Sequence, residues 1–125
     1  MSKILAIGGG EIGRPGTKME TIPIDKEIIK LSNKKNPKLL FIPTASSDSS
    51  SYYKVIKKYF GKKLGCKTSV LYLINKKYKK EELRKIILST DIIYVGGGDT
   101  LKMIEVWKEN KLDLFLKEAL DKGIV

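Results

Sequence analysis

The chain has 125 residues, of which 42% are hydrophobic and 31% charged, and this composition suits one folded domain and excludes wholesale disorder. One cysteine and no histidine are present, which excludes an internal disulfide, a Ser-His or Cys-His pair within these residues and the usual zinc ligands. The formal net charge is +11, but only Arg14 and Arg84 among the 25 basic residues are arginines, and this lysine bias argues against nucleic acid as a partner.

The first predicted element is a buried strand at Lys3–Ile7, where a short apolar run ends at three glycines. Residues Arg14–Ile24 carry two prolines and are predicted to form an exposed loop. A helix is expected next, with apolar residues at helical spacing: Ile24, Ile28, Ile29 and Leu31. The motif KLLFIP, residues 38–43, predicts the second strand, which Pro43 stops.

Two further helices and two further strands are predicted between residues 49 and 95. Residues 49–65 are expected to form an amphipathic helix that a serine caps. Its apolar face contains Tyr52, Val55, Ile56, Tyr59 and Phe60. A strand at Thr68–Ile74 and a helix over residues 79–89 follow, and the helix directs Leu83, Ile86 and Ile87 inward. The apolar run Asp91–Val95 predicts the fourth strand.

The C-terminal part is predicted to contain two more helices. Asp99 or Thr100 caps the first of them. Its residues available for burial are Leu101, Ile104 and Val106 or Trp107. The second covers residues 112–123 and ends at Gly123. Ile124 and Val125 are β-branched and are expected to begin a fifth strand, so residues 1–125 are expected to be the N-terminal part of a longer α/β domain.

This alternation of strands and helices predicts an α/β fold, with a parallel sheet covered by helices on both faces. With the fifth strand incomplete, residues near Tyr94 and Val95 are expected at an exposed sheet edge or paired with another chain, which makes a homo-oligomer through that edge one expectation. No apolar run is long enough to span a bilayer and the Met1 end lacks a signal-peptide pattern, so the sequence predicts a cytoplasmic protein without a membrane partner.

Three turns at the C-terminal ends of strands carry unusual residues. Gly8, Gly9 and Gly10 follow the first strand, Thr44 and Ser46 follow the second, and Gly96, Gly97, Gly98, Asp99 and Thr100 follow the fourth. Any one of them is explained by tight turns and helix caps. Together they would line one rim of the sheet, where uncovered backbone N–H groups suit a phosphate or the oxyanion of an acyl-transfer intermediate.

A nucleotide site is the weaker of these two hypotheses. Gly8, Gly10 and Gly13 match the bare G-x-G-x-x-G spacing, but the loop-like residues after them do not open a helix as a dinucleotide fold requires. Five serines lie in the second turn, and without a histidine they are interpreted as caps and loop polar groups rather than nucleophiles: Ser46, Ser47, Ser49, Ser50 and Ser51.

The motifs KILAIGGGEIG, LLFIPTASSDSSSYY and DIIYVGGGDT, in this order and at these intervals, resemble the N-terminal half of the dipeptidase E and cyanophycinase family of serine peptidases. The resemblance implies a flavodoxin-like, doubly wound sheet similar to that of class I glutamine amidotransferases. It also implies that the turn at residues 96–98 supplies a backbone N–H to an oxyanion hole. Asp99 stands where many members have Asn, and Thr100 fits the hydroxyl residue found there.

In this family the nucleophilic serine lies in a G-x-S-A-G elbow after the fifth strand. The resemblance therefore places the nucleophile beyond Val125, with no catalytic residue on this chain, which alone is expected to be inactive. The implied activity is hydrolysis of short peptides, N-terminally aspartyl ones among them, through a Ser acyl-enzyme and without a cofactor. The alternative is a non-catalytic flavodoxin-like module whose glycine turns bind a phosphate or nucleotide.

Overall fold

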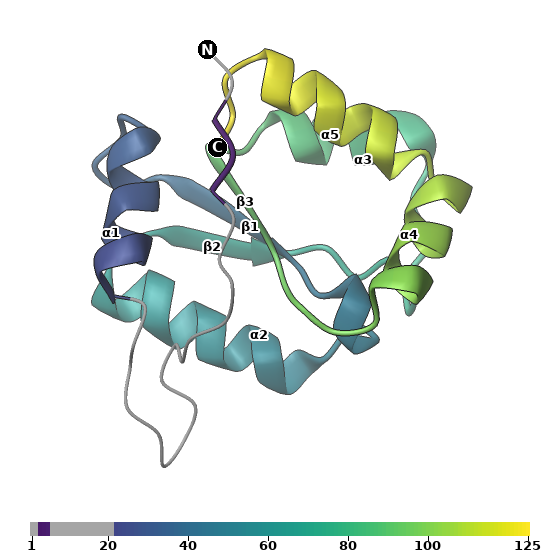
Figure 1. Cartoon of the computed structure of the whole chain (residues 1–125), viewed down its shortest axis with the longest axis horizontal. Coiled ribbons are helices and arrows are strands. Elements are labelled where there is room, and N and C mark those ends of the chain that lie inside the picture. The colour runs from purple at the N-terminus through teal and green to yellow at the C-terminus, as the bar shows by residue number, and fades with distance from the viewer. Residues whose placement is uncertain (1–2, 6–21) are drawn as a thin grey trace.

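A computed structural model describes residues 3–5 and 22–125 of the chain (Figure 1). Within these ranges the chain forms three strands, β1 (Lys38–Ile42), β2 (Lys67–Val70) and β3 (Ile92–Val95). The helical elements are α1 (Ile22–Leu31), the 3₁₀ turn η1 (Thr44–Ser46), α2 (Ser50–Ile56), the π-helical segment η2 (Lys57–Lys63), α3 (Lys80–Leu88), α4 (Thr100–Glu109) and α5 (Leu112–Asp121). The predicted alternation of strands and helices is confirmed from residue 22 onward.

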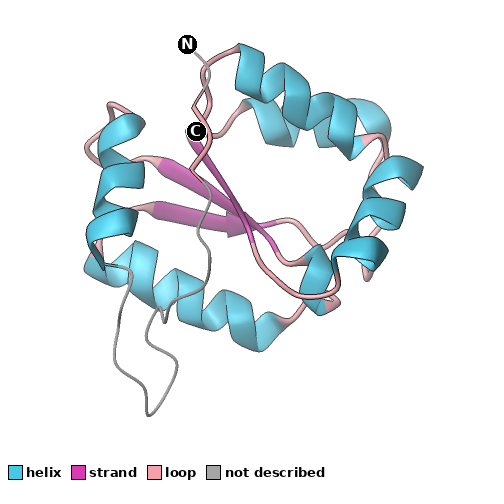
Figure 2. Cartoon of the chain, in the orientation of Figure 1, coloured by secondary structure: helices cyan, strands magenta, loops and turns pink. Residues whose placement is uncertain are grey.

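The three strands form one parallel sheet in the order β2-β1-β3 (Figure 2). Leu39 of β1 lies opposite Thr68 of β2 and opposite Ile92 of β3, so β1 is the central strand. The chain passes from β1 to β2 through α2 and then crosses back through α3 to the other side of β1. This change of direction is the signature of a doubly wound sheet.

Both faces of β1 are buried, as its continuous apolar sequence predicts. Leu39 and Phe41 join one core cluster with residues of α1, α2 and η2. Leu40 and Ile42 join a second cluster with residues of α3 and α5. The helices therefore cover the sheet from two sides, α1 and α2 on one and α3, α4 and α5 on the other (Figure 1).

Two predicted boundaries at the start of this region are wrong. Helix α1 begins at Ile22, so residues 22–24 are helical although the sequence predicted a loop through Ile24. Pro23 is tolerated there because the first turn of a helix leaves its N–H groups unpaired in any case. Residues Lys3–Leu5 form no strand, and Ile4 is exposed. Arg14–Thr21 and Ala6–Gly13 lie outside the described residues.

Strand β2 is also shorter than the predicted strand Thr68–Ile74. The N–H of Leu71 still donates to the carbonyl of Phe41 at 2.9 Å. The next acceptor along β1 would be the carbonyl of Pro43, but this oxygen already accepts from the N–H groups of Ser46 (3.1 Å) and Asp48 (3.0 Å). Because η1 uses the acceptor that a longer β2 needs, the ladder ends and residues 71–74 continue as irregular chain.

Helix α4 differs from the prediction on its apolar side. Leu101 is 70% exposed and Ile104 is 40% exposed, whereas both were expected to be buried. Val106 and Trp107 are partly buried and pack against the cluster under α3 and α5. No residue of α4 is fully buried, because only one side of its second half reaches the core.

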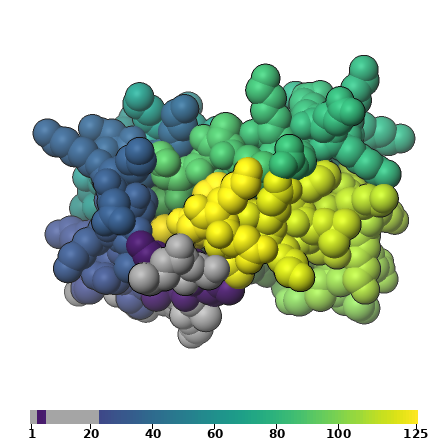
Figure 3. Space-filling view, turned by 90° about the horizontal axis from the view of Figure 1, so that it is seen from above, coloured from purple at the N-terminus to yellow at the C-terminus, as the bar shows by residue number. Residues whose placement is uncertain are grey.

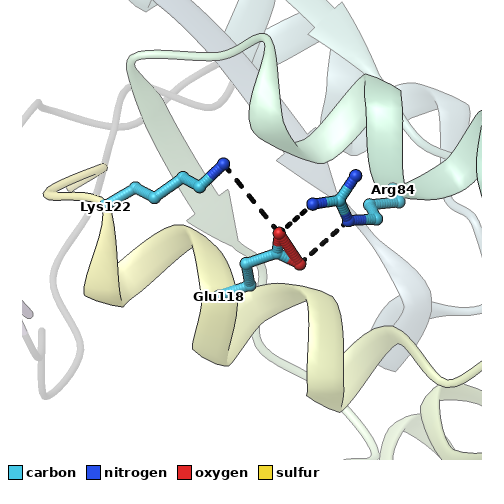
Figure 4. A network of polar contacts seen from close by, with 3 residues as sticks. All are labelled: Arg84, Glu118 and Lys122. Carbon is cyan, nitrogen blue, oxygen red and sulfur yellow. Dashed lines mark hydrogen bonds and ion pairs between the residues drawn. The ribbon is translucent and has the colours of Figure 1, made fainter.

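Helices α3 and α5 are joined by an ion pair at the surface (Figure 4). The guanidinium of Arg84 donates to both carboxylate oxygens of Glu118, with Nε to Oε2 at 3.0 Å, and Lys122 approaches the same carboxylate at 3.9 Å. The hydrogen bond from Arg84 lowers the pKa of Glu118. Gly123, with φ of +84°, ends α5 as predicted, and the N–H of Ile124 donates back to the carbonyl of Ala119 at 3.1 Å.

The last residue pairs with the outer edge of β3. Val125 donates to the carbonyl of Asp91 (3.2 Å) and accepts from the N–H of Ile93 (2.8 Å), which is the bonding pattern of a parallel ladder. Residues 3–5 lie beside these C-terminal residues in both Figure 1 and Figure 3. Residues 3–5 themselves are not part of the sheet.

Cys66 is buried in the cluster beneath η2 and supplies a first prediction. Burial raises the pKa of its thiol from 9.0 to about 11. We expect Ellman's reagent to label the folded chain slowly near neutral pH and the unfolded chain rapidly, because only the thiolate reacts. Since the folded pKa is the higher one, this group's contribution to stability is complete below pH 9 and is lost as the pH rises towards 11. Rapid labelling of the folded chain at neutral pH would contradict this burial.

Candidate functional site

The candidate site lies where β1 and β3 end side by side. After β1 the chain turns towards α2 on one face of the sheet, and after β3 it turns towards α4 on the other. Connections that leave neighbouring parallel strands in opposite directions open a crevice at the carboxyl ends of those strands, and ligands bind in such crevices in doubly wound folds. The turns predicted after the second and fourth strands, at residues 44–46 and 96–100, border this position.

These two turns are bonded directly to each other. The N–H of Asp99 donates to the carbonyl of Ala45 at 2.7 Å. The indole Nε1–H of Trp107, in the second half of α4, donates to Oγ1 of Thr44 at 3.1 Å. At the surface, Nζ of Lys102 donates to Oγ of Ser47 at 2.9 Å. The turns after β1 and β3 therefore lie side by side, while Gly8, Gly9 and Gly10 lie outside the described residues.

The three glycines after β3 have different roles. Gly96 extends the ladder, with its N–H donating to the carbonyl of Ile42 at 3.2 Å, and an added Cβ would meet the rings of Phe41 and Tyr52 at 3.0 and 3.1 Å. Gly98 has a φ of +147°, and a Cβ there would lie 2.2 Å from the carbonyl oxygen of Ala45. Gly97 has no atom within 4 Å of the position of an added Cβ. Glycine is therefore required at 98, a larger residue at 96 would have to displace the rings of Phe41 and Tyr52 slightly, and Gly97 faces open space.

The backbone donors of this turn are available. Within the part of the chain that the structure describes, no hydrogen bond uses the N–H of Gly97 or of Gly98, and both residues are exposed. They directly precede the N-terminus of α4, where the helix dipole favours negative charge. An exposed pair of N–H groups beside a helix N-terminus can stabilise an anion, whether a phosphate or a developing oxyanion.

Asp99, one of the two residues predicted as a cap, caps α4. Its Oδ1 accepts from the N–H of Lys102 at 3.1 Å. The carboxylate is thereby held by the helix N-terminus, which is a favourable position for a negative charge. Thr100 is the first residue of the helix and is exposed.

The turn after β1 is compact and contains five serines, at positions 46, 47, 49, 50 and 51. Ser46 is partly buried and its hydroxyl donates to the carbonyl of Pro43 at 3.0 Å, while Thr44 is fully buried. Ser49 caps α2 by accepting from the N–H of Tyr52 at 3.2 Å, and Ser51 lies within hydrogen-bond distance of Ser49 at 3.0 Å. The interpretation of serines here as capping and loop groups is confirmed for these hydroxyls.

Asp48 anchors the second turn to the loop after β2. It is only 4% exposed and has a φ of +57°, a conformation that aspartate adopts more easily than most residues. Its Oδ2 accepts from the N–H groups of Ile74 (2.8 Å) and Asn75 (2.7 Å). Oδ1 is buried without a hydrogen-bond partner among the described residues. The three strand ends are thus tied together, β2 to β1 through Asp48 and β1 to β3 through Ala45.

An aromatic cluster supports the turn from below. The ring of Phe41 lies 4.8 Å from that of Tyr52 and 5.9 Å from that of Tyr94, between centroids. Burial raises the pKa of Tyr94 well above its ordinary value, with smaller contributions from Tyr52 and Asp25. Tyr94 therefore stays protonated at physiological pH and serves as packing under the glycines rather than as a base.

The sequence did not identify three of the residues that shape the site. The buried carboxylate of Asp48 accepts a hydrogen bond, as does the backbone carbonyl of Ala45, and the indole N–H of Trp107 donates one. Each of the three partners lies in a distant segment of the chain. Only the rarity of tryptophan, present once in the chain, was a signal that could have been used. Among the described residues, no group of three or more His, Cys, Asp or Glu side chains is placed to hold a metal ion, and no helix is long and apolar enough to cross a membrane.

Known proteins resemble the chain over almost its whole length. The sequence model of peptidase family S51 matches residues 4–125. A curated relative from Bacillus subtilis (strain 168), named "Uncharacterized peptidase YgaJ", is 37% identical over 127 residues, which cover 100% of this chain and 52% of the relative. The crystal structure of a candidate peptidase E protein from Listeria monocytogenes EGD-e has a TM-score of 0.65 and 24% identity, over 82% of this chain and 49% of that one. The structural likeness shows a flavodoxin-like α/β fold, and the chain spans about half the length of both proteins.

Proposed function

Because the chain belongs to peptidase family S51, we propose that it forms the N-terminal part of a serine peptidase that hydrolyses short peptides. In this proposal the turn at Gly96–Gly98 provides one side of the oxyanion hole, and a serine beyond Val125 is the nucleophile. The relative that matches the chain is named a peptidase and is about twice as long as the chain, which leaves room for a nucleophile and a base outside these residues.

The observation that carries the proposal is the position of Val125. It lies level with Ile92 in a parallel ladder on the outer edge of β3. A strand that continues from there would run beside β3 and, at about 3.3 Å per residue, would reach the level of Gly96 and Gly97 after about four or five residues. A tight turn at that level would hold a side chain beside the exposed N–H groups of the glycine turn.

The chemistry follows from that juxtaposition. The serine Oγ would form a bond to the peptide carbonyl carbon while a base takes its proton, and the carbonyl oxygen would gain the negative charge that an N–H of Gly97 or Gly98 can stabilise. Collapse of this intermediate would break the C–N bond, return the proton to the leaving amine and leave an acyl-enzyme for water to hydrolyse. A histidine base would also lie outside this chain, which has no histidine.

Substrate and location are further parts of the proposal. Peptides with an N-terminal aspartate are the proposed substrates, on the family resemblance alone. The cytoplasm is the proposed compartment, and a buried free thiol at Cys66 is compatible with its reducing conditions.

The test begins with the natural coding sequence after Val125. We expect a G-x-S-A-G motif within about five residues, and a stop codon at that point would overturn the proposal. The protein translated from the complete reading frame is then assayed with aspartyl p-nitroanilide, with leucyl p-nitroanilide as the control for specificity. Hydrolysis that persists after Ser→Ala in the motif would contradict a serine nucleophile. Binding of inorganic phosphate by a protein without hydrolytic activity would favour the non-catalytic alternative.

A further inference from the structure

The glycine turn is suspended between two anchors on the same segment. Gly96 donates to the carbonyl of Ile42 and Asp99 donates to the carbonyl of Ala45, and the two peptide N–H groups between them are unbonded within the described part of the chain. The direction of these two N–H groups therefore depends on where the second anchor holds Asp99. Asp99 is also the N-cap of α4, so the orientation of that helix and the direction of the N–H groups are coupled.

Helix α4 has little packing to fix its orientation. None of its residues is fully buried, and Leu101 and Ile104 are exposed. Two hydrogen bonds join it to η1 itself, from Asp99 to Ala45 at its start and from Trp107 to Thr44 about two turns later. The exposed side chain of Lys102 also donates to Ser47, the residue after η1. The bond from Trp107 to Thr44 is the one that fixes the second half of α4 to η1, and without it that half is held by the packing of Val106 and of the ring at 107 on the second core cluster.

We infer that Thr44 and Trp107 are positioning residues, which hold α4 against η1 and so direct the N–H groups of Gly97 and Gly98. The effect of these two residues on catalysis rests on the proposed peptidase function. Thr44 is fully buried, so its hydroxyl has no water to replace the indole as a partner, and losing either group leaves the other without its bond. The hydrogen bond of Trp107 goes to Thr44 and not to the glycine turn, so the role inferred for it is positioning and not catalysis.

The structural part is tested by amide exchange in the chain itself, measured by NMR. Thr44→Val keeps the shape of the side chain and removes the hydroxyl, and Trp107→Phe keeps an aromatic ring and removes the N–H. We expect each to speed exchange of the Asp99 amide by about five- to tenfold, the effect of one lost neutral hydrogen bond. Thr44→Ser keeps the hydroxyl and is expected to retain slow exchange.

Thr90→Val is the matched control. Thr90 is also a buried threonine, and its Oγ1 makes one hydrogen bond, to the carbonyl of Ile87 at 2.9 Å. It lies before the start of β3, at the end of the strand away from the glycine turn. Thr90→Val should therefore leave the exchange rate of the Asp99 amide unchanged. Equal exchange in the wild-type, Thr44→Val and Trp107→Phe chains, or an equal acceleration by Thr90→Val, would overturn the inference.

The catalytic part is tested with the same variants in the protein from the complete reading frame. Misdirected oxyanion donors lower kcat by about tenfold and leave KM within about twofold, because the donors act mainly in the transition state. A change in KM alone, or no change in kcat, would contradict a positioning role. If the wild-type protein shows no hydrolysis, the proposed function fails, while the exchange measurements still decide whether Thr44 and Trp107 hold the turn.

Discussion

Gly98→Ala is expected to destabilise the chain by about 3 kcal/mol or more, through backbone strain and a steric clash combined. The added Cβ would lie 2.2 Å from the carbonyl oxygen of Ala45 and 2.5 Å from its carbonyl carbon, and Gly98 has a φ of +147°. These neighbours are backbone atoms, which cannot rotate away as a side chain would. Relief therefore requires the glycine turn and η1 to separate, which also breaks the bond between Asp99 and Ala45. Urea denaturation measures the loss as a lower midpoint.

Gly97→Ala is the control for this prediction. No atom lies within 4 Å of the Cβ that it adds, so its effect on the free energy of unfolding should stay within about 0.5 kcal/mol. The two substitutions are chemically identical and one residue apart. Similar losses of stability in both would show that the close contact between Gly98 and Ala45 is absent.

Asp48→Ala is expected to cost about 3 kcal/mol, because it leaves two backbone N–H groups without their acceptor. The buried carboxylate accepts from both Ile74 and Asn75, and charge-assisted hydrogen bonds of this kind are stronger than neutral ones. Alanine also tolerates the left-handed backbone at this position less well than aspartate does. The loss should appear in thermal or urea unfolding, together with faster amide exchange at residues 74 and 75.

Two variants calibrate that result. Asp48→Asn keeps an acceptor and a left-handed residue, so it should lose roughly half as much. Asp99→Ala removes an exposed cap with a single N–H partner and should cost only about 1 kcal/mol. An Asp48→Ala loss no larger than that of Asp99→Ala would mean that Asp48 does not hold the loop after β2.

Two predictions from the sequence were wrong near the site: the burial of Leu101 and Ile104, and the length of the strand predicted at residues 68–74. The helical spacing of Leu101 and Ile104 correctly predicted a helix, but spacing cannot tell which face of a helix finds a neighbour. The strand prediction at Thr68–Ile74 failed for a related reason. Its residues suit a strand, yet the acceptor that would extend the ladder is taken by η1, which belongs to a different part of the chain.

The sequence by itself determined the order of the elements from residue 22 onward, the parallel α/β class, a serine cap before α2, a cap at Asp99 or Thr100, the end of α5 at Gly123, and the family. These features depend on neighbouring residues and on local periodicity, which a sequence displays directly. Only the tertiary structure decided which glycine must be a glycine, that Ala45 and Asp99 are bonded, and that Asp48, Thr44 and Trp107 hold the strand ends together. Those contacts join segments up to 63 residues apart, and they form only when the sheet brings the ends of its strands to one edge.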